Sequence, residues 1–324
     1  MKAAYITTLG SPDVITYGEM DRPVPGPTDV LVRVEAAAVD PVDTFVRSGA
    51  YRTPTPFPFV LGRDLVGTVA ETGPGATGFA VGDRVWSHSM GHGGRQGVTA
   101  EYCVVGVDRL YHLPGDVDAA RAVAVLHPVA TAHLALFRHA RLRPGETVLV
   151  IGGAGNVGGA ATVLAARAGA RVLAVARAET ASDCLRAGAT AVVDHRDPDA
   201  AEQLRELTGD GVDVHLDTSG HQDLDAALAV VGHGARVVLM AGLTARPVLP
   251  VGAVYPRDVS LVGFAISNAS VDDLAGTARV INHGLADDAF PIPVTVELPL
   301  SRTAEAHRMI EAGGVRGRIV LRPE

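Results

Sequence analysis

The sequence predicts an α/β protein with two domains: a doubly wound parallel sheet, and a β-rich domain made from both ends of the chain. The length of 324 residues is enough for about two domains of ~150 residues each. Residues 1–120 carry many prolines and glycines between short β-type runs, whereas residues 121–264 alternate strand-like and helix-like segments. Residues 265–324 end in another β-type run. We therefore expect residues 1–120 and 265–324 to form the β-rich domain, and residues 121–264 to form the parallel sheet.

The first 120 residues indicate irregular β structure with many turns. The β-type runs lie at 30–34, 67–71, 83–86 and 101–105. The segments RPVPGP at 22–27 and TPTPFPF at 53–59 cannot lie inside a helix, because proline lacks the amide donor and obstructs the preceding turn.

Strands and helices alternate in the middle of the chain. The strand-like runs lie at 147–151, 171–176, 191–194, 212–217, 236–240 and 260–264. The helix-like segments lie at 157–168, 180–187, 200–207 and 224–231, and Gly169, Gly188 and Gly209 stand where helices should stop. Strands joined by helical crossovers predict a parallel sheet with helices on both faces. The uncharged stretch 148–166 is long enough to span a bilayer, but its glycines favour a buried strand, a turn and a buried helix.

Composition excludes several classes of protein. The formal charge of −8 and the aromatic content of 4% make nucleic acid and anionic membranes unexpected partners. Lys2 is the only lysine, so Schiff-base chemistry elsewhere in the chain is excluded. Cys103 and Cys184 are far apart, which excludes a disulfide scaffold and fits a cytoplasmic protein. The first residues show no apolar core of signal-peptide length.

A glycine-rich turn is the strongest motif. Gly153-x-Gly155-x-x-Gly158 directly follows a predicted strand and directly precedes a predicted helix. A side chain at Gly155 would keep a pyrophosphate away from the backbone, and Gly158 lets the helix pack closely on the strand. The helix amides and the positive end of the helix dipole would then face the anion. The alternative is a turn that serves packing alone. We expect a dinucleotide to bind at Gly153, Ala154, Gly155, Asn156, Val157 and Gly158.

The end of the next strand favours NADPH over NADH. Sites for NADH usually place a carboxylate there to bind the ribose 2′-hydroxyl, but this strand ends in Ala176-Arg177. A guanidinium can bind a 2′-phosphate through paired donors. Glu179 would weaken this preference, whereas His195 and Arg196 would add to the phosphate pocket. The alternatives are a solvated charge at Arg177 and an ordinary polar loop after the third strand.

Segments along the whole chain resemble one family. They are AAAVDPVDTFVRSGAY (36–51), PFVLGRDLVGTVAETG (58–73), GHGGRQGVTAEYCVV (91–105), the glycine turn, and AGGVRGRIVL (312–321). The chain resembles the medium-chain dehydrogenase/reductase superfamily, and within it the zinc-free NADPH:quinone oxidoreductases, the zeta-crystallin-like branch. The resemblance implies a Rossmann domain, a discontinuous GroES-like catalytic domain around it, and an active site in the cleft between them.

The same resemblance bears on a catalytic zinc ion. Zinc-dependent relatives use two cysteines and a histidine at positions where this chain has Asp40, Arg63 and His127. Because arginine is a permanent cation and cannot ligate a metal, we expect no metal site. Isolated histidines and carboxylates usually serve hydrogen bonds or solvent. Residue types that can ligate a metal are nevertheless present at Asp40, Asp64, His127, His88 and His92.

The resemblance also implies roles for individual residues. Thr131 would contact the nicotinamide end of the cofactor, and Arg318 would reach the cofactor as well. Tyr51 would face the substrate, either as a hydrogen-bond donor or as a packing aromatic. Asp40 stands where the family often has asparagine, and an ionised carboxylate cannot donate a hydrogen bond to a carbonyl. By their positions in the resemblance, Tyr51 and Asp40 are the two catalytic candidates. The segments 216–220, 240–243 and 263–266 would line the cofactor through Thr218, Ser219, Ala241, Gly242, Leu243, Phe264 and Ala265.

The expected function is NADPH-dependent transfer of hydride to a quinone or a conjugated enone without a metal. Simple ketones need a Lewis acid to stabilise the developing alkoxide, whereas quinones and enones accept hydride more readily. Two alternatives stay open: an enoyl or alkenal reductase of a biosynthetic pathway, and a protein that binds NADPH without catalysis. We also expect a small-molecule substrate. The resemblance implies a homodimer joined through strand 259–264, an apolar edge strand that would favour pairing with a second copy.

Overall fold

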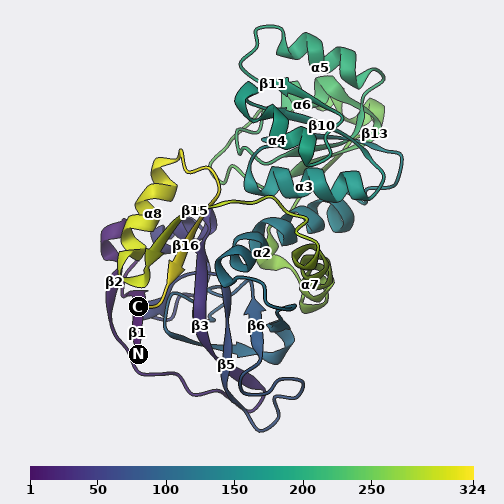
Figure 1. The fold of residues 1–324 in the computed structure, drawn as a ribbon. Helices are drawn as coiled ribbons and strands as arrows, with labels where there is room; N and C mark the ends of the chain where they lie inside the picture. The colour runs from purple at the N-terminus through teal and green to yellow at the C-terminus, as the bar shows by residue number, and fades with distance from the viewer. The chain divides into compact units, whose positions relative to one another are not determined.

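Two units divide the computed structural model, which describes every residue from 1 to 324 (Figure 1). Unit 1 comprises Met1–His127, Ser270–Asp288 and Ile292–Glu324, and unit 2 comprises Pro128–Ala269 and Ala289–Pro291. Unit 1 therefore contains both ends of the chain. Helix α2 (Ala119–His133) passes from unit 1 into unit 2. The domain limits expected at 120 and 264 stay predictions.

A largely antiparallel sheet forms the centre of unit 1. Its strands are β3 (Asp29–Val39), β5 (Asp64–Thr72), β6 (Arg84–Ser87), β7 (Tyr102–Gly106), β8 (Tyr111–His112), β15 (Val294–Pro299) and β16 (Arg318–Arg322). The order is β15-β16-β3-β5-β6-β8, and β7 also pairs with β3. Ile319 of β16 stands opposite Val39 of β3 in antiparallel register. The last strand of the chain therefore places Arg318 beside Asp40, the residue that follows β3.

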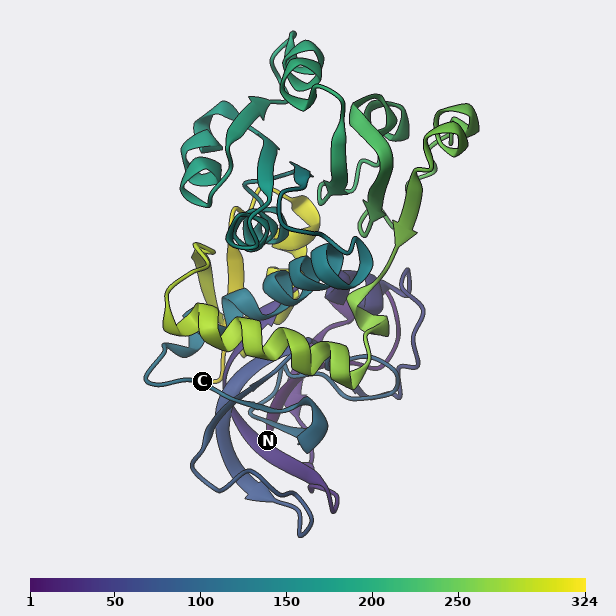
Figure 2. The same ribbon diagram turned by 90° about the vertical axis from the view of Figure 1, so that its right-hand side faces the viewer.

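A small sheet and three helices complete unit 1. The small sheet has the order β2-β1-β4, with β1 (Lys2–Ile6), β2 (Thr16–Glu19) and β4 (Phe59–Val60). The helices are α1 (Pro41–Ser48), α7 (Val271–Ala286) and α8 (Thr303–Ala312). Helix α7 lies across the strands of the main sheet (Figure 2), where Asn282 accepts a hydrogen bond of 2.9 Å from the Trp86 indole. Thr277 of α7 lies 3.1 Å from Nε2 of His88.

The core of unit 1 follows from the alternation of side chains along its long strands. Val30, Val32 and Val34 of β3 are buried and pack in one cluster with Leu65 of β5 and Val85 of β6. Strands β3 and β5 come so close that a Cβ at Gly67 would lie 2.2 Å from the carbonyl oxygen of Arg33. This packing holds the ends of β3 and β5, and with them Asp40 and Asp64, in fixed positions.

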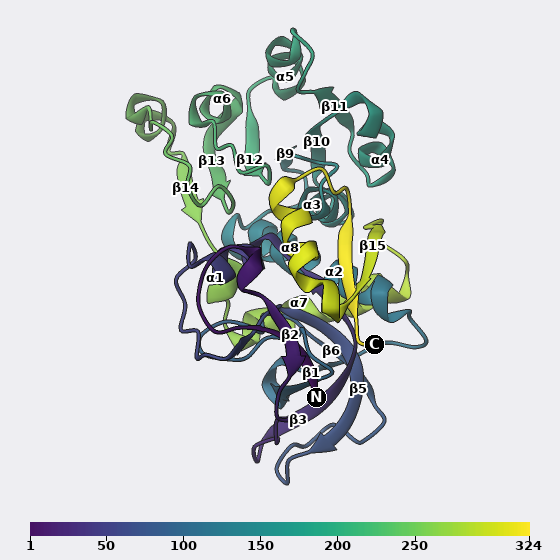
Figure 3. The ribbon, with the colours of Figure 1, turned by 90° about the vertical axis from the view of Figure 1, so that its left-hand side faces the viewer.

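Unit 2 has the parallel sheet that the sequence predicts (Figure 3). Its strands are β9 (Thr147–Ile151), β10 (Arg171–Ala176), β11 (Ala191–Asp194), β12 (Val212–Asp217), β13 (Val231–Leu239) and β14 (Ser260–Gly263). All neighbouring strands pair in parallel, in the order β11-β10-β9-β12-β13-β14. This is the doubly wound order, in which ligands bind beyond the carboxyl ends of the strands.

The predicted strands and helices of unit 2 are confirmed, with one clear difference. The helices are α3 (Asn156–Arg167), α4 (Ala181–Arg186), α5 (Ala200–Thr208) and α6 (Leu224–Val230), each within one residue of its expected ends. Strand β13 begins at Val231 rather than at the expected residue 236. The pairing of β13 with β12 shifts register across the glycine-containing segment 232–235. In the sequence alone, the glycines of this segment favour a loop.

Four helices lie where the sequence analysis assigned none: α1, α2, α7 and α8. The stretch 148–166 is a strand, a turn and a helix, as its glycines indicated. A different stretch, Ala119–His139, has the length and apolar composition of a membrane-spanning helix. In its most apolar window, 78% is buried inside the protein, so this stretch also fits the core helix of a folded domain.

Candidate functional site

The glycine turn between β9 and α3 is shaped by close backbone contacts. The amides of Gly152 and Gly153 both donate to the carbonyl oxygen of Val175 at 3.0 Å. Gly152 has a φ of +79°, a conformation that glycine adopts without strain. A Cβ at Gly158 would lie 2.1 Å from the oxygen of Gly152, so α3 packs on the turn only because this residue is glycine.

Helix α3 presents its first turn without a competing anion. Gly155 is the N-cap, it is exposed, and no side chain caps the helix. The first turn also contains no acidic residue. The first amides of a helix have no partner within the helix, and they carry the positive end of its dipole. The turn therefore has the geometry that suits an anion, and binding at Ala154, Asn156 and Val157 stays a prediction.

The end of β12 lies against this turn in unit 2. The Thr218 hydroxyl donates to the Ile151 carbonyl oxygen at 2.8 Å, and a Cβ at Gly152 would lie 2.7 Å from that hydroxyl. The amide and the hydroxyl of Ser219 both donate to Asp217 at 2.7 Å. The structure thus brings Thr218 and Ser219 to the glycine turn.

The loops after β13 and β14 hold the remaining predicted lining residues. A Cβ at Gly242, where φ is +80°, would lie 2.4 Å from the oxygen of Gly220, so this loop packs on the one after β12. Ala241 accepts a hydrogen bond of 3.1 Å from the Gln222 amide, and half-exposed Leu243 follows. The Phe264 ring stacks on His139 with centroids 4.4 Å apart. Ala265 follows directly.

Two arginines flank one glutamate beyond the end of β10. Arg177 and Arg196 are exposed, and their guanidinium groups lie 3.9 and 3.8 Å from the Glu179 carboxylate. The backbone amide of His195 donates to the oxygen of Ala176 at 3.3 Å. Arg196 therefore lies near the same carboxylate as Arg177, and binding of a 2′-phosphate by Ala176, Arg177 and His195 stays a prediction.

Thr131 and Tyr51, which the resemblance singles out, lie in different units. Thr131 is on α2 in unit 2, where its hydroxyl oxygen is buried and has no hydrogen-bond partner. Tyr51 is half-buried in unit 1, packs against an apolar cluster that includes Phe59, and lies 5.9 Å from the His92 ring. The structure shows the packing contact of Tyr51; its role toward a substrate stays a prediction.

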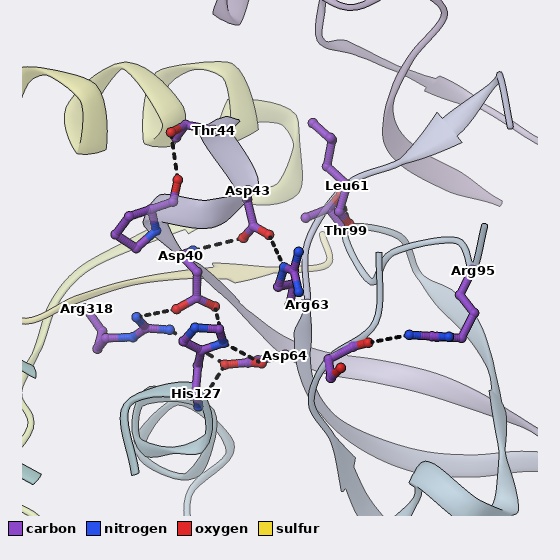
Figure 4. Close-up of polar contacts among 12 residues, drawn as sticks. Asp40, Asp43, Thr44, Leu61, Arg63, Asp64, Arg95, Thr99, His127 and Arg318 are labelled. Atoms are coloured by element: carbon purple, nitrogen blue, oxygen red, sulfur yellow. Dashed lines mark hydrogen bonds and ion pairs between the residues drawn. The ribbon is translucent and has the colours of Figure 1, made fainter. Parts of the chain in front are cut away.

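Unit 1 contains a buried charge cluster (Figure 4) formed by Asp40, Asp43, Arg63, Asp64, His127 and Arg318. The Arg318 guanidinium donates to Oδ1 of Asp40 at 2.7 Å and lies 3.8 Å from Oδ2 of Asp64. The His127 backbone amide donates to Oδ2 of Asp64 at 3.1 Å. On α1, Asp43 accepts a 2.9 Å hydrogen bond from the Asp40 amide and lies 3.7 Å from Nε of Arg63.

Burial and neighbouring charges shift the pKa values of the residues in the buried charge cluster in different directions. Burial, the largest single effect, opposes ionisation of Asp40, but the charge and hydrogen bond of Arg318, with contributions from other neighbouring groups, together lower the pKa of Asp40 below its ordinary value. Burial, followed by the charge of Asp40, raises the pKa of Asp43 to about 7 and the pKa of Asp64 well above its ordinary value. Burial lowers the pKa of His127 to about 4. At neutral pH, Asp40 is therefore ionised and His127 is neutral.

The placement of Arg318 and Asp40 differs from what the resemblance implies. Both side chains are buried, with exposures of 3% and 0%, and they pair with each other rather than facing open space. Contact of Arg318 with a cofactor and catalysis by Asp40 therefore stay predictions. Sequence reasoning missed this pair, because only the pairing of β16 with β3 brings the two residues together.

We expect the protein to lose stability as pH falls from 7 to 5. Burial lowers the pKa to about 3 or 4 in His88, His127, His215 and His307. In the unfolded chain these imidazoles take up protons near pH 6.5, so their contribution to stability is complete above pH 6.5 and is lost toward pH 4. Between pH 6.5 and pH 4, each of these imidazoles lowers the free energy of unfolding by ~1.4 kcal/mol for each unit by which the pH falls.

The raised pKa of Asp43 and of Asp64 acts in the opposite direction, but these carboxyl groups are fewer than the buried imidazoles. Thermal unfolding followed by circular dichroism at pH 7, 6 and 5 should give a falling Tm. A Tm that stays constant or rises over this range would contradict the prediction.

Comparison with known proteins gives matches over both units. Residues 26–115 match the family described as "Alcohol dehydrogenase GroES-like domain", and residues 156–282 match the family described as "Zinc-binding dehydrogenase". The "Quinone oxidoreductase" of Mus musculus is 31% identical over 327 residues, covering 99% of this chain and 97% of that protein. A "Mycocerosic acid synthase-like polyketide synthase" of Mycobacterium tuberculosis is 30% identical over 98% of this chain but only 15% of the synthase.

Solved structures match over the full length of the chain. An "NAD-dependent alcohol dehydrogenase" has a TM-score of 0.90 at 30% identity, covering 100% of both chains. A mycobacterial protein complexed with NADPH has a TM-score of 0.86 at 32% identity, again covering 100% of both chains. These matches confirm the fold class and the resemblance that the sequence indicated.

Proposed function

Because this chain belongs to the medium-chain dehydrogenase/reductase family, we propose that it is an NADPH-dependent oxidoreductase that reduces quinones or conjugated enones without a metal. Membership of the family makes it an oxidoreductase. The observation that carries the finer proposal is the uncapped first turn of α3 behind Gly155, together with the arginines beyond β10. The first feature suits a pyrophosphate and the second suits a ribose 2′-phosphate.

A nicotinamide dinucleotide fits the residues present. Space beside Gly155 is open, since only the oxygen of Gly152, at 3.2 Å, would lie within 4 Å of a Cβ there. Amides of the first turn of α3 would hold the pyrophosphate, and Arg177 and Arg196 would hold a 2′-phosphate. When bound, such a cofactor supplies a hydride from its nicotinamide ring. The buried, unpartnered hydroxyl of Thr131 would orient that ring.

A catalytic zinc ion does not fit this chain, although one matching family is described as zinc-binding. The residue types that could ligate a metal, Asp40, Asp64 and His127, have donor atoms within 4.8 Å of one another. However, the Arg318 guanidinium lies 2.7 Å from Asp40 and 3.8 Å from Asp64, and so already supplies positive charge. The set also lacks the thiolates that zinc favours. We therefore derive no step from a metal.

An acceptor panel tests this proposal. The wild-type protein should oxidise NADPH in the presence of quinones or conjugated enones, and a chelator should leave the rate unchanged. Simple ketones should give little turnover, because no Lewis acid stabilises an alkoxide. NADPH binding without turnover on any acceptor would instead favour a non-catalytic binding protein. Turnover that a chelator abolishes would reject the metal-free mechanism.

A reductase of enoyl thioesters or alkenals is the second candidate. The match to a stretch of a polyketide synthase supports it, since an acyl chain under assembly is carried as a thioester. Such a substrate also presents a conjugated carbon–carbon double bond to hydride. Including an enoyl thioester in the same panel separates the two candidates. Turnover of the thioester without turnover of any quinone would replace the first candidate with the second.

An Arg177→Ala protein should bind NADPH roughly 10-fold more weakly, because it lacks the guanidinium that would hold the 2′-phosphate. The loss is modest because solvent weakens the charged hydrogen bond of an exposed side chain. The affinity for NADH should be unchanged, because NADH has no 2′-phosphate. A Glu179→Gln protein should bind NADPH more tightly, since its carboxylate lies near both Arg177 and Arg196 and competes for them. Titration of intrinsic or NADPH fluorescence measures both effects.

Arg186→Ala is the matched control for the cofactor preference. Arg186 is an exposed arginine of the same unit that pairs with Asp183 on α4. Its replacement should leave the affinities for both cofactors unchanged. Equal loss of NADPH and NADH affinity in Arg177→Ala would contradict a role in binding the 2′-phosphate.

A homodimer through β14 is part of this proposal. Strand β14 is the outer strand of the sheet in unit 2, and it has a partner, β13, on one side. The chain before it exposes Val248, Val251 and Tyr255. An open, apolar sheet edge favours pairing with another chain. Light scattering should give twice the mass of the chain, and a monomer at micromolar concentration would remove the idea.

A further inference from the structure

Three buried polar atoms converge in the buried charge cluster without hydrogen-bond partners. They are Oδ2 of Asp40, Oδ1 of Asp64 and Nδ1 of His127. The imidazole nitrogen lies 3.9 Å from the first oxygen and 4.0 Å from the second. These separations are too long for direct hydrogen bonds. Carboxylate oxygens and an imidazole nitrogen that face one point are the donor set a divalent cation would take.

The charges around this point argue against a cation in the wild-type chain. Arg318 approaches from β16, with one nitrogen on the other oxygen of Asp40 and one near the other oxygen of Asp64. Arg63 approaches from the start of β5 and faces Asp43 on α1. The two guanidinium groups therefore already supply positive charge beside the carboxylates of Asp40, Asp43 and Asp64. A dication at this point would be repelled by the nearby charge of Arg318.

We propose that the Arg318 guanidinium takes the electrostatic place of a divalent cation in this cluster. The wild-type chain therefore excludes metal from the point between Asp40, Asp64 and His127, and a neutral residue at position 318 converts that point into a divalent-cation site. The inference rests on the metal-free function proposed above, and extends it by naming the group that replaces the metal.

Titration with Co²⁺ tests the inference, followed by visible absorption of the bound ion and by thermal unfolding. The wild-type protein should show no bound Co²⁺. An Arg318→Gln protein should bind one Co²⁺ per chain at least ~100-fold more tightly, because a like charge a few ångströms from the ion is removed. Arg318→Lys keeps the charge and should not gain the site. The double variant Arg318→Gln, Asp40→Asn should not bind Co²⁺ more tightly than the wild type, because one ligand of the site is absent.

Arg322→Gln is the control for loss of an arginine from the same strand. Arg322 pairs with Glu297 at 2.6 Å on the exposed side of β16, so its replacement should leave Co²⁺ binding as in the wild type. If Arg318→Gln is unfolded alone, Co²⁺ should restore folding and raise its Tm; failure to do so overturns the proposal. A folded Arg318→Gln protein that binds no Co²⁺ overturns it as well.

The outcomes also separate this inference from the proposed function. The claim that the wild-type cluster excludes metal is overturned if the wild-type protein binds one Co²⁺ per chain and the Asp40→Asn protein does not. If that metal also supports turnover, the metal-free function fails with it. If the wild type is active and free of metal while Arg318→Gln gains no site, only the role of Arg318 is wrong.

Discussion

A Gly158→Ala protein is expected to lose at least ~100-fold in affinity for NADPH, which corresponds to one or two charged hydrogen bonds of ~1.5–3 kcal/mol each. The added Cβ would lie 2.1 Å from the oxygen of Gly152 and 3.0 Å from the Cα of Gly153. Because both contacts are with backbone, α3 would have to move away from the turn. Its first amides would then no longer face the same point as Gly155. Fluorescence titration with NADPH measures the loss.

Gly159→Ala provides a matched control one residue away on the same helix. A Cβ at Gly159 would lie 3.7 Å from the oxygen of Gly153, which is an ordinary van der Waals contact. This protein should therefore bind NADPH as the wild type does. Equal affinities in the two variants would show that the fit of α3 on the glycine turn does not govern binding.

An Asp40→Ala protein is expected to be destabilised by ~3–5 kcal/mol, the usual cost of removing one partner of a buried ion pair. The Arg318 guanidinium, at 3% exposure, would lose its 2.7 Å hydrogen bond and keep only the more distant Asp64. Asp40→Asn should lose less, since the amide oxygen can still accept that hydrogen bond. Denaturant unfolding followed by circular dichroism measures the change.

The exposed pair of Arg322 and Glu297 gives the comparison for the buried one. Its nitrogen–oxygen distance is 2.6 Å, but both side chains are more than one-third exposed. Glu297→Ala should therefore cost at most ~1 kcal/mol. If Asp40→Ala and Glu297→Ala are equally stable, the buried pair does not hold unit 1 together.

The parallel sheet of unit 2 could be predicted because its signals are local. Strand-like runs such as 147–151 and 171–176 are short, apolar and bounded by glycines, so periodicity and turns define them. Helix α7 carried a local signal too. Ser270 and Asp273 form a capping box, with hydrogen bonds of 3.1 and 3.4 Å, and the spacing of these two residues marks the start of the helix in the sequence.

The buried charge cluster could not be predicted because it depends on long-range pairing. Asp40 and Arg318 are 278 residues apart in the chain, and only the register of β16 on β3 joins them. The glycine turn lies at the other extreme: strand, turn and helix are consecutive, so its geometry follows from the motif itself. Gly152, which takes the left-handed conformation, precedes the motif and was not among the predicted binding residues.

Calorimetric titration of the wild-type protein with NADPH and with NADH tests the central claim most directly. We expect one NADPH to bind per chain with measurable heat, and with a lower Kd than NADH, because the anion-binding turn of α3 and the arginines beyond β10 act together. The absence of heat with either nicotinamide cofactor would contradict the account.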